Sequence, residues 1–151
     1  MCGIVGLFLK NKSLEPQLGQ MLAGMLGTMC ERGPDSAGFA VYGSGDSEHV
    51  KLTLRGASAK TNFAALAGMV EASIGAPVTV ETHATHAVFT VPAKLEAAAR
   101  EAITAEDKTV KVVSAGNRME IYKEVGRPDR VAERFDLAHM KGSHGIGHTR
   151  M

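Results

Sequence analysis

An apolar stripe at helical spacing, directly after a short strand-like run, constrains the fold of this chain more than any other feature. Residues 3–9 are apolar and rich in branched side chains, which is typical of a buried strand. After a polar break at residues 11–13, apolar residues recur every three or four positions and predict a helix with Ser13 as its N-cap. The stripe comprises Leu14, Leu18, Met21, Leu22, Met25, Leu26 and Met29. This order indicates a fold in which sheet packs against helix.

The rest of the chain alternates between the same two kinds of element. Strands are predicted at residues 39–42, 49–54 and 145–150, and the first two are joined by a turn. Residues 78–91 look like one extended segment that ends at Pro92, and 110–113 with 119–125 look like a hairpin. Helices are predicted at residues 62–73, 95–103 and 129–137. We therefore expect mixed α and β structure.

Composition excludes several classes of protein. A length of 151 residues with 44% hydrophobic and 22% charged residues suits one globular domain. A formal net charge of +1, with 5% aromatic residues and no Trp, argues against a nucleic-acid surface. No apolar run approaches the roughly 20 residues of a membrane span, and no basic region precedes the first apolar run. We therefore expect a cytoplasmic protein with no membrane segment.

Cys2 is the first candidate for chemistry, because it follows Met1 and precedes Gly3. If Met1 is removed, one residue carries both a thiol and a free α-amino group, and the amine can serve as base for the thiol. The same three residues also fit a small buried thiol at the start of a chain. The second cysteine, Cys30, is expected to be a buried thiol, and a disulfide between the two would disable the nucleophile.

Two further motifs add positive charge at defined places. Residues 32–38 read Arg-Gly-Pro-Asp-Ser-Ala-Gly, and residues 147–150 read Gly-His-Thr-Arg. A guanidinium stays charged at working pH, so one near a thiolate supplies a fixed positive charge. At a strand end it can hold a carboxylate by two hydrogen bonds. Taken singly, the first motif also fits a solvated turn and the second a surface strand end.

In this order, the three segments resemble the class II glutamine amidotransferase family, whose members are N-terminal nucleophile hydrolases that release ammonia from glutamine. The resemblance covers residues 2–6, 32–40 and 145–150. It implies that Cys2 is the catalytic nucleophile and that its own amine is the general base. It also implies L-glutamine as substrate and no metal or organic cofactor.

The same resemblance gives roles to four other side chains. Arg150 would bind the α-carboxylate of glutamine, and Arg32 would support the pocket around the thiol. His148 and Thr149 match the motif and would serve packing and orientation.

The resemblance also implies a fold and a division of the chain. The family has a four-layer αββα sandwich, of which we expect part here, so the fold class is α+β. Residues 1–56 would form the front of the amidotransferase domain and residues 57–139 an inserted small α+β lobe. Residues 140–151 would belong to the amidotransferase domain again. Such an insertion is similar to amidotransferase subunits of glutamate-synthase-related enzymes, including N-methylglutamate synthases. That likeness implies partner synthase subunits that consume the ammonia, with flavin and iron–sulfur groups on the partner.

One part of the family's pattern is missing. The family's oxyanion hole uses an Asn-Gly pair downstream of the Gly-His-Thr-Arg strand, and an Asp further on holds the glutamine amino group. Here Asn11, Asn62 and Asn117 are followed by Lys, Phe and Arg. We therefore expect the front part of a larger domain, with little glutaminase activity alone. Two alternatives remain: a non-catalytic or truncated assembly subunit, or a hydrolase of another amide, which Arg150 argues against.

The histidines do not predict a metal site. His83 and His86 are three apart, which on one strand places them on opposite faces. His139, His144 and His148 lie close in sequence, but no Cys or carboxylate pair completes a ligand set.

Overall fold

The computed structural model describes residues 2–149, which divide into two compact units. The first unit holds the chain up to Ser44 and from Ile121 onward, and the second holds Gly45–Glu120. The described residues form two four-stranded antiparallel sheets and four α-helices, which confirms the predicted α+β class. Residues 121–139, assigned to the inserted lobe from sequence, lie in the first unit, and residues 45–56 lie in the second.

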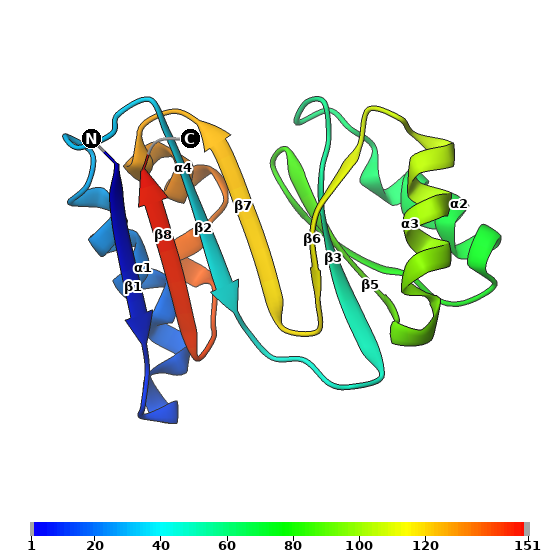
Figure 1. Ribbon diagram of the computed structural model, residues 1–151, viewed down its shortest axis with the longest axis horizontal. Coiled ribbons are helices and arrows are strands. Elements are labelled where there is room, and N and C mark those ends of the chain that lie inside the picture. Colours follow the sequence, from blue (N-terminus) through cyan, green and yellow to red (C-terminus); the bar gives the residue numbers. More distant parts are fainter. Residues whose placement is uncertain (1, 150–151) are drawn as a thin grey trace. The chain divides into compact units, whose positions relative to one another are not determined.

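The first unit is built on a sheet with the strand order β1-β8-β2-β7, which can be followed in Figure 1. Its elements are β1 (Gly3–Phe8), the 3-10 helix η1 (Lys12–Gln17), α1 (Leu18–Gly27), β2 (Ser36–Tyr42), β7 (Met119–Val125), α4 (Pro128–Arg134), the 3-10 helix η3 (Leu137–His139) and β8 (His144–Thr149). The strand that comes last in the chain therefore lies between the first two.

On the face that α1 covers, strand β8 has glycine at positions 145 and 147, so few side chains separate the strand from the helix. A Cβ at Gly145 would lie 2.7 Å from Leu22, and one at Gly147 would lie 3.1 Å from Leu26. Both leucines are fully buried on α1. Glycine at these two positions therefore lets the helix pack directly on the backbone of the central strand.

The two faces of this sheet differ. Phe39 of β2, Tyr122 of β7 and Phe135 pack as an aromatic cluster on the helix side, with ring centroids 5.2–6.1 Å apart. On the opposite face Ile4 and Phe8 of β1 and Ile146 of β8 are 74%, 66% and 47% exposed. The unit therefore has one covered face and one open apolar face.

The first helix begins later than the sequence predicts. Asn11, not Ser13, caps the start, and its side chain accepts a 3.0 Å hydrogen bond from the Ser13 N–H. The segment that follows is the 3-10 helix η1, which contains Pro16, and the α-helix starts only at Leu18. Proline has no N–H to donate, so it suits this first segment better than an α-helix interior.

The second unit has the element order β3 (His49–Arg55), α2 (Phe63–Ile74), β4 (Thr79–His83), β5 (His86–Pro92), the 3-10 helix η2 (Ala93–Leu95), α3 (Glu96–Glu106) and β6 (Lys111–Gly116). Its sheet has the order β4-β5-β3-β6, and α2 and α3 share a buried apolar core with it. This βαββαβ arrangement is ferredoxin-like. The unit thus has a core of its own.

Two strand pairings differ from those predicted. The segment 78–91 is not one strand: it turns at Ala84, which has a φ of 50°, and His83 of β4 pairs with His86 of β5. The two histidines are therefore cross-strand neighbours, so the argument that they face apart is wrong. The hairpin expected from residues 110–113 and 119–125 is also wrong, because β6 pairs with β3 while β7 belongs to the other sheet.

Among residues 2–149, no helix combines the length and the apolar character that crossing a membrane requires.

Two glycines of α1 give a matched test of how this unit packs. A Cβ at Gly19 would overlap the carbonyl oxygen of Leu137 and lie 2.6 Å from that of Met140, whereas Gly24 has nothing within 4 Å. We expect Gly19→Ala to lower the free energy of unfolding by about 1–3 kcal/mol through overpacking. Gly24→Ala should raise it by about 0.5–1 kcal/mol, because alanine favours a helix. Urea unfolding measures both, and a Gly19→Ala protein as stable as wild type would contradict the packing described.

Candidate functional site

The three sequence motifs meet at one end of the first unit's sheet. Strand β8 pairs with both neighbours, and its last residue, Thr149, lies opposite Gly3 of β1 and opposite Ala37 of β2. Cys2 directly precedes Gly3, and Ala37 belongs to the Arg-Gly-Pro-Asp-Ser-Ala-Gly motif. Antiparallel pairing thus brings together segments from both ends of the chain.

The buried side chain of Thr149 is the point of contact. It is fully buried, and its Oγ1 accepts a 3.1 Å hydrogen bond from the Gly3 N–H. A Cβ at Gly33 would lie 2.7 Å from the same oxygen. One hydroxyl therefore touches the start of β1, the loop at residues 32–35 and the end of β8.

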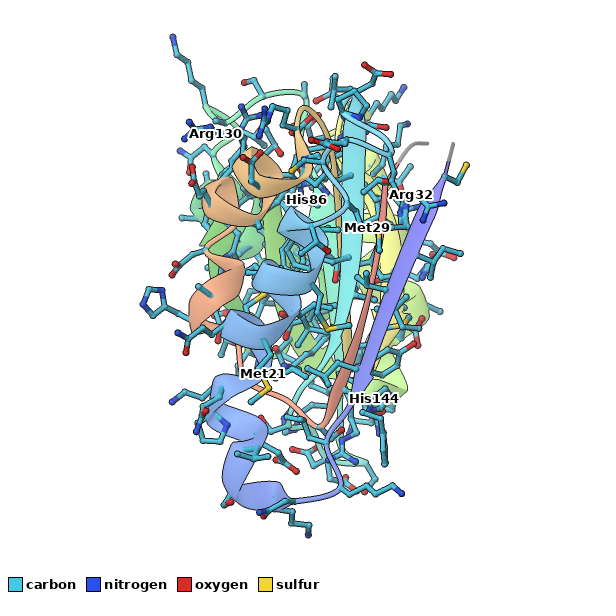
Figure 2. All side chains as sticks on the ribbon, turned by 90° about the vertical axis from the view of Figure 1, so that its left-hand side faces the viewer. Met21, Met29, Arg32, His86, Arg130 and His144 are labelled. Atoms are coloured by element: carbon cyan, nitrogen blue, oxygen red, sulfur yellow. The ribbon has the colours of Figure 1, made fainter. Side chains whose placement is uncertain are left out.

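The candidate nucleophile and one candidate arginine lie around this contact. Cys2 is exposed and its thiol is free. Arg32 is also exposed, and its backbone N–H donates a 3.0 Å hydrogen bond to the Met29 carbonyl. A Cβ at Gly3 would lie 2.9 Å from Met29 Sδ, and Figure 2 shows Arg32 and Met29 at the end of the sheet where β1 begins. Arg150 lies outside the described residues.

A second group of charged side chains, Arg127 and Asp129, lies near Cys30, since Arg127 and Cys30 line the same depression. Arg127 donates two hydrogen bonds to Asp129, at 3.1 and 2.9 Å. These bonds lower the pKa of the Asp129 carboxyl to about 2 and raise the pKa of Arg127. The thiol of Cys30 contributes in a minor way to both pKa shifts, and it is half-buried rather than buried as the sequence predicted. The carbonyl of Asp35 accepts a 2.8 Å bond from Gly126, so loop and cluster are tied together.

A depression of about 690 Å³ adjoins this cluster. Its walls are formed by residues near the end of α1, by the loop and by the residue before α4: Gly27, Thr28, Cys30, Glu31, Pro34 and Arg127. Neither Cys2 nor Arg32 lines it. Among the described residues, no three His, Cys, Asp or Glu side chains are grouped so as to hold a metal ion.

Sequence reasoning missed the Cys30–Arg127–Asp129 cluster and the hydrogen bond of Thr149. Nothing in the sequence links Cys30 to Arg127, although both line the same depression in the folded chain. The sequence feature that could have indicated the Thr149 contact is Gly33. Glycine allows a close approach to the backbone, and the Thr149 hydroxyl makes such an approach there.

Over almost its whole length the chain is similar to one protein named glutamine amidotransferase-like and to another named putative glutamine amidotransferase. It is 51% identical over 151 residues to the glutamine amidotransferase-like protein GlxB of Rhizobium meliloti, of which it covers 50%. It is 28% identical over 158 positions to a putative glutamine amidotransferase of Methanothermobacter thermautotrophicus, of which it covers 52%. The chain thus spans about half the length of these curated relatives. No family model matches it.

The Arg127–Asp129 pair gives a pH-dependent prediction. In an NMR titration, we expect the Asp129 carboxyl to titrate at about 2, and Arg127→Gln to raise its pKa toward the usual ~3.9. The folded pKa lies below the unfolded value, so the stabilisation is complete above about pH 4 and is lost as pH falls through about 2.

Arg130→Gln is the control for this titration. Arg130 pairs with Glu133 at 2.8 Å, so its loss should leave the pKa of Asp129 in place. An Asp129 pKa that does not move in Arg127→Gln would contradict the assigned cause.

Proposed function

We propose that this chain carries the nucleophile-bearing part of a class II glutamine amidotransferase, an N-terminal nucleophile hydrolase that converts L-glutamine to glutamate and ammonia. The observation that carries the proposal is the exposed Cys2 thiol next to Gly3, whose N–H is hydrogen-bonded to Thr149. The likeness to a protein named glutamine amidotransferase-like and to one named putative glutamine amidotransferase supports glutamine as the substrate.

The mechanism uses Cys2 twice. Once Met1 is removed, the α-amino group takes the thiol proton, and the thiolate attacks the side-chain amide carbon of glutamine. The tetrahedral oxyanion collapses, the C–N bond breaks, and the amine returns its proton to the leaving ammonia. Water then hydrolyses the γ-glutamyl thioester to glutamate and regenerates the thiol. No step needs a metal or an organic cofactor.

The two arginines have binding roles in this proposal. Arg150 follows the buried Thr149 and would hold the α-carboxylate of glutamine by two hydrogen bonds. Arg32 would contribute positive charge beside the thiolate from the loop that contacts Thr149 through Gly33. The carboxylate-binding role of Arg150 would favour an amino-acid substrate over other amides.

We further propose that the ammonia serves a partner synthase of the glutamate-synthase type, with flavin and iron–sulfur groups on the partner. The support is the inserted lobe, for which the compact second unit at Gly45–Glu120 supplies a folded candidate. A rival proposal is a non-catalytic assembly subunit, and it rests on the absence of Asn-Gly within these 151 residues.

The open apolar face of the first unit fits the αββα sandwich of this class. Ile4, Phe8 and Ile146 are exposed there, and the His144 ring stacks on Tyr42 with centroids 4.1 Å apart. Figure 2 shows His144 at the end of the sheet opposite Arg32. We propose that a second sheet of the same domain covers this face, since the curated relatives are about twice as long as this chain.

Replacing the nucleophile is the direct test of the function. In the intact protein, Cys2→Ala should reduce glutamate release from glutamine by on the order of 10³-fold or more, because the covalent route is lost. Cys30→Ala is the matched control, since that thiol lies outside the proposed reaction, and should stay close to wild type. Unchanged activity in Cys2→Ala would overturn the assignment.

The mature N-terminus separates the enzyme from its rival. Mass spectrometry should find a chain that begins at Cys2, because the free amine is the proposed base. A retained Met1 would block that amine and favour a non-catalytic subunit.

The 151-residue chain made alone should release little glutamate. It contains no Asn-Gly pair to stabilise the oxyanion, and loss of one such donor costs about 10²–10³ in rate. The assay compares this chain with a polypeptide as long as the curated relatives. Turnover by the short chain at about 1–10³ per second would place an oxyanion site within these residues and contradict the expectation.

A further inference from the structure

We propose that Thr149 is a positioning residue for Cys2, acting through the peptide that joins Cys2 to Gly3. The inference rests on the proposed function and states how Thr149, for which the family resemblance implies packing and orientation, acts on the nucleophile. Its basis is the hydrogen bond from the Gly3 N–H to Thr149 Oγ1, which joins residues 146 positions apart.

The first step is that the hydroxyl has a fixed place. Thr149 is fully buried, and a β-branched side chain has few rotamers to choose from. A Cβ at Gly33 would lie 2.7 Å from Thr149 Oγ1 and 2.9 Å from Thr149 Cβ, and one at Gly3 would lie 3.1 Å from the oxygen. Glycine at both positions therefore leaves a niche of the size of this hydroxyl.

The second step carries the constraint to the nucleophile. A peptide unit is planar, so the N–H of Gly3 lies in one plane with the carbonyl and the Cα of Cys2. Holding that N–H fixes the plane, and with it the place from which the thiol and the amine of Cys2 project. Cys2 is itself exposed, so this bond supplies orientation that packing does not.

The third step separates positioning from packing. Thr149→Val keeps the shape but removes the hydroxyl that accepts from the Gly3 N–H, so that this N–H keeps only its main-chain pairing with Thr149 in the β1–β8 ladder. Thr149→Ser keeps the hydroxyl and loses only a methyl group. A packing role predicts that Val is tolerated better than Ser, whereas a positioning role predicts the reverse.

The experiment measures kcat and KM for glutamine in the intact protein for these two variants. We expect Thr149→Val to lower kcat about tenfold or more, with KM for glutamine changed much less, and Thr149→Ser to restore most of kcat. Thr53→Val is the matched control, because Thr53 is an equally buried threonine in the second unit and its change should leave kcat unaffected.

A second readout does not depend on turnover. Iodoacetamide labelling followed by mass spectrometry gives the alkylation rate of Cys2, and Cys30 in the same molecule is the internal reference. Thr149→Val should change the rate and pH profile of Cys2 labelling and leave Cys30 labelling alone, while Thr149→Ser should match wild type in both.

The outcomes are distinct. If the wild type is active and Thr149→Val has the same kcat as wild type, or a higher kcat than Thr149→Ser, the positioning role is wrong. The proposed function is unaffected by that result. An inactive wild type removes the proposed function, and the labelling rates then decide the positioning role alone. If Thr149→Val fails to fold, as shown by a lost melting transition, the test rests on Thr149→Ser. A Cys2 labelling rate in Thr149→Ser that differs from wild type would then contradict the inference.

Discussion

The placement of β8 between β1 and β2 is the constraint on which the first unit depends. Strand β8 comes last in the described chain, yet it pairs with β1 and β2, the first two strands. Thr149 of β8 lies directly opposite Gly3 of β1. The glycines of β8 let Leu22 and Leu26 of α1 rest on the backbone, so sheet pairing and helix packing depend on the same residues. Such contacts close very long loops, and pairing of this kind is slow to form. The candidate site therefore exists only after both ends of the chain have been brought together.

Much of the local structure could be predicted from the sequence, because periodicity reports burial. The apolar stripe that includes Leu18, Leu22 and Leu26 predicted the first helix, and all three side chains are fully buried. The segment 62–73 gave α2, whose start is capped by Asn62 and whose end is Gly75 with a φ of 65°. The three motifs could also be found, since each combines unusual residue types in a short span. Their meeting at one end of the sheet is a finding of the structure.

What could not be predicted was pairing between segments. Ala84 takes a positive φ that alanine rarely adopts, so nothing in residues 78–91 marked the turn between β4 and β5. Residues 115–118 looked like a hairpin turn, but β6 and β7 belong to different sheets. The Asn11 cap was missed because Ser13 is an equally good capping residue. The Thr149 bond needed three dimensions, since its partner is 146 positions away.

In the chain, the second unit is inserted between β2 and β7, which are neighbours in the first unit's sheet. The chain leaves after β2 and returns along β7, so for that sheet Gly45–Glu120 takes the place of a hairpin loop (Figure 1). The entropy of closing a loop rises only with the logarithm of its length, by about 0.6 kcal/mol for each doubling. Replacing a turn of a few residues with this segment would cost the sheet only about 2–3 kcal/mol even if the segment were flexible. Because the segment folds around its own core, its two ends are held by that core as well as by the host sheet, and the closure cost does not fall on the host sheet alone.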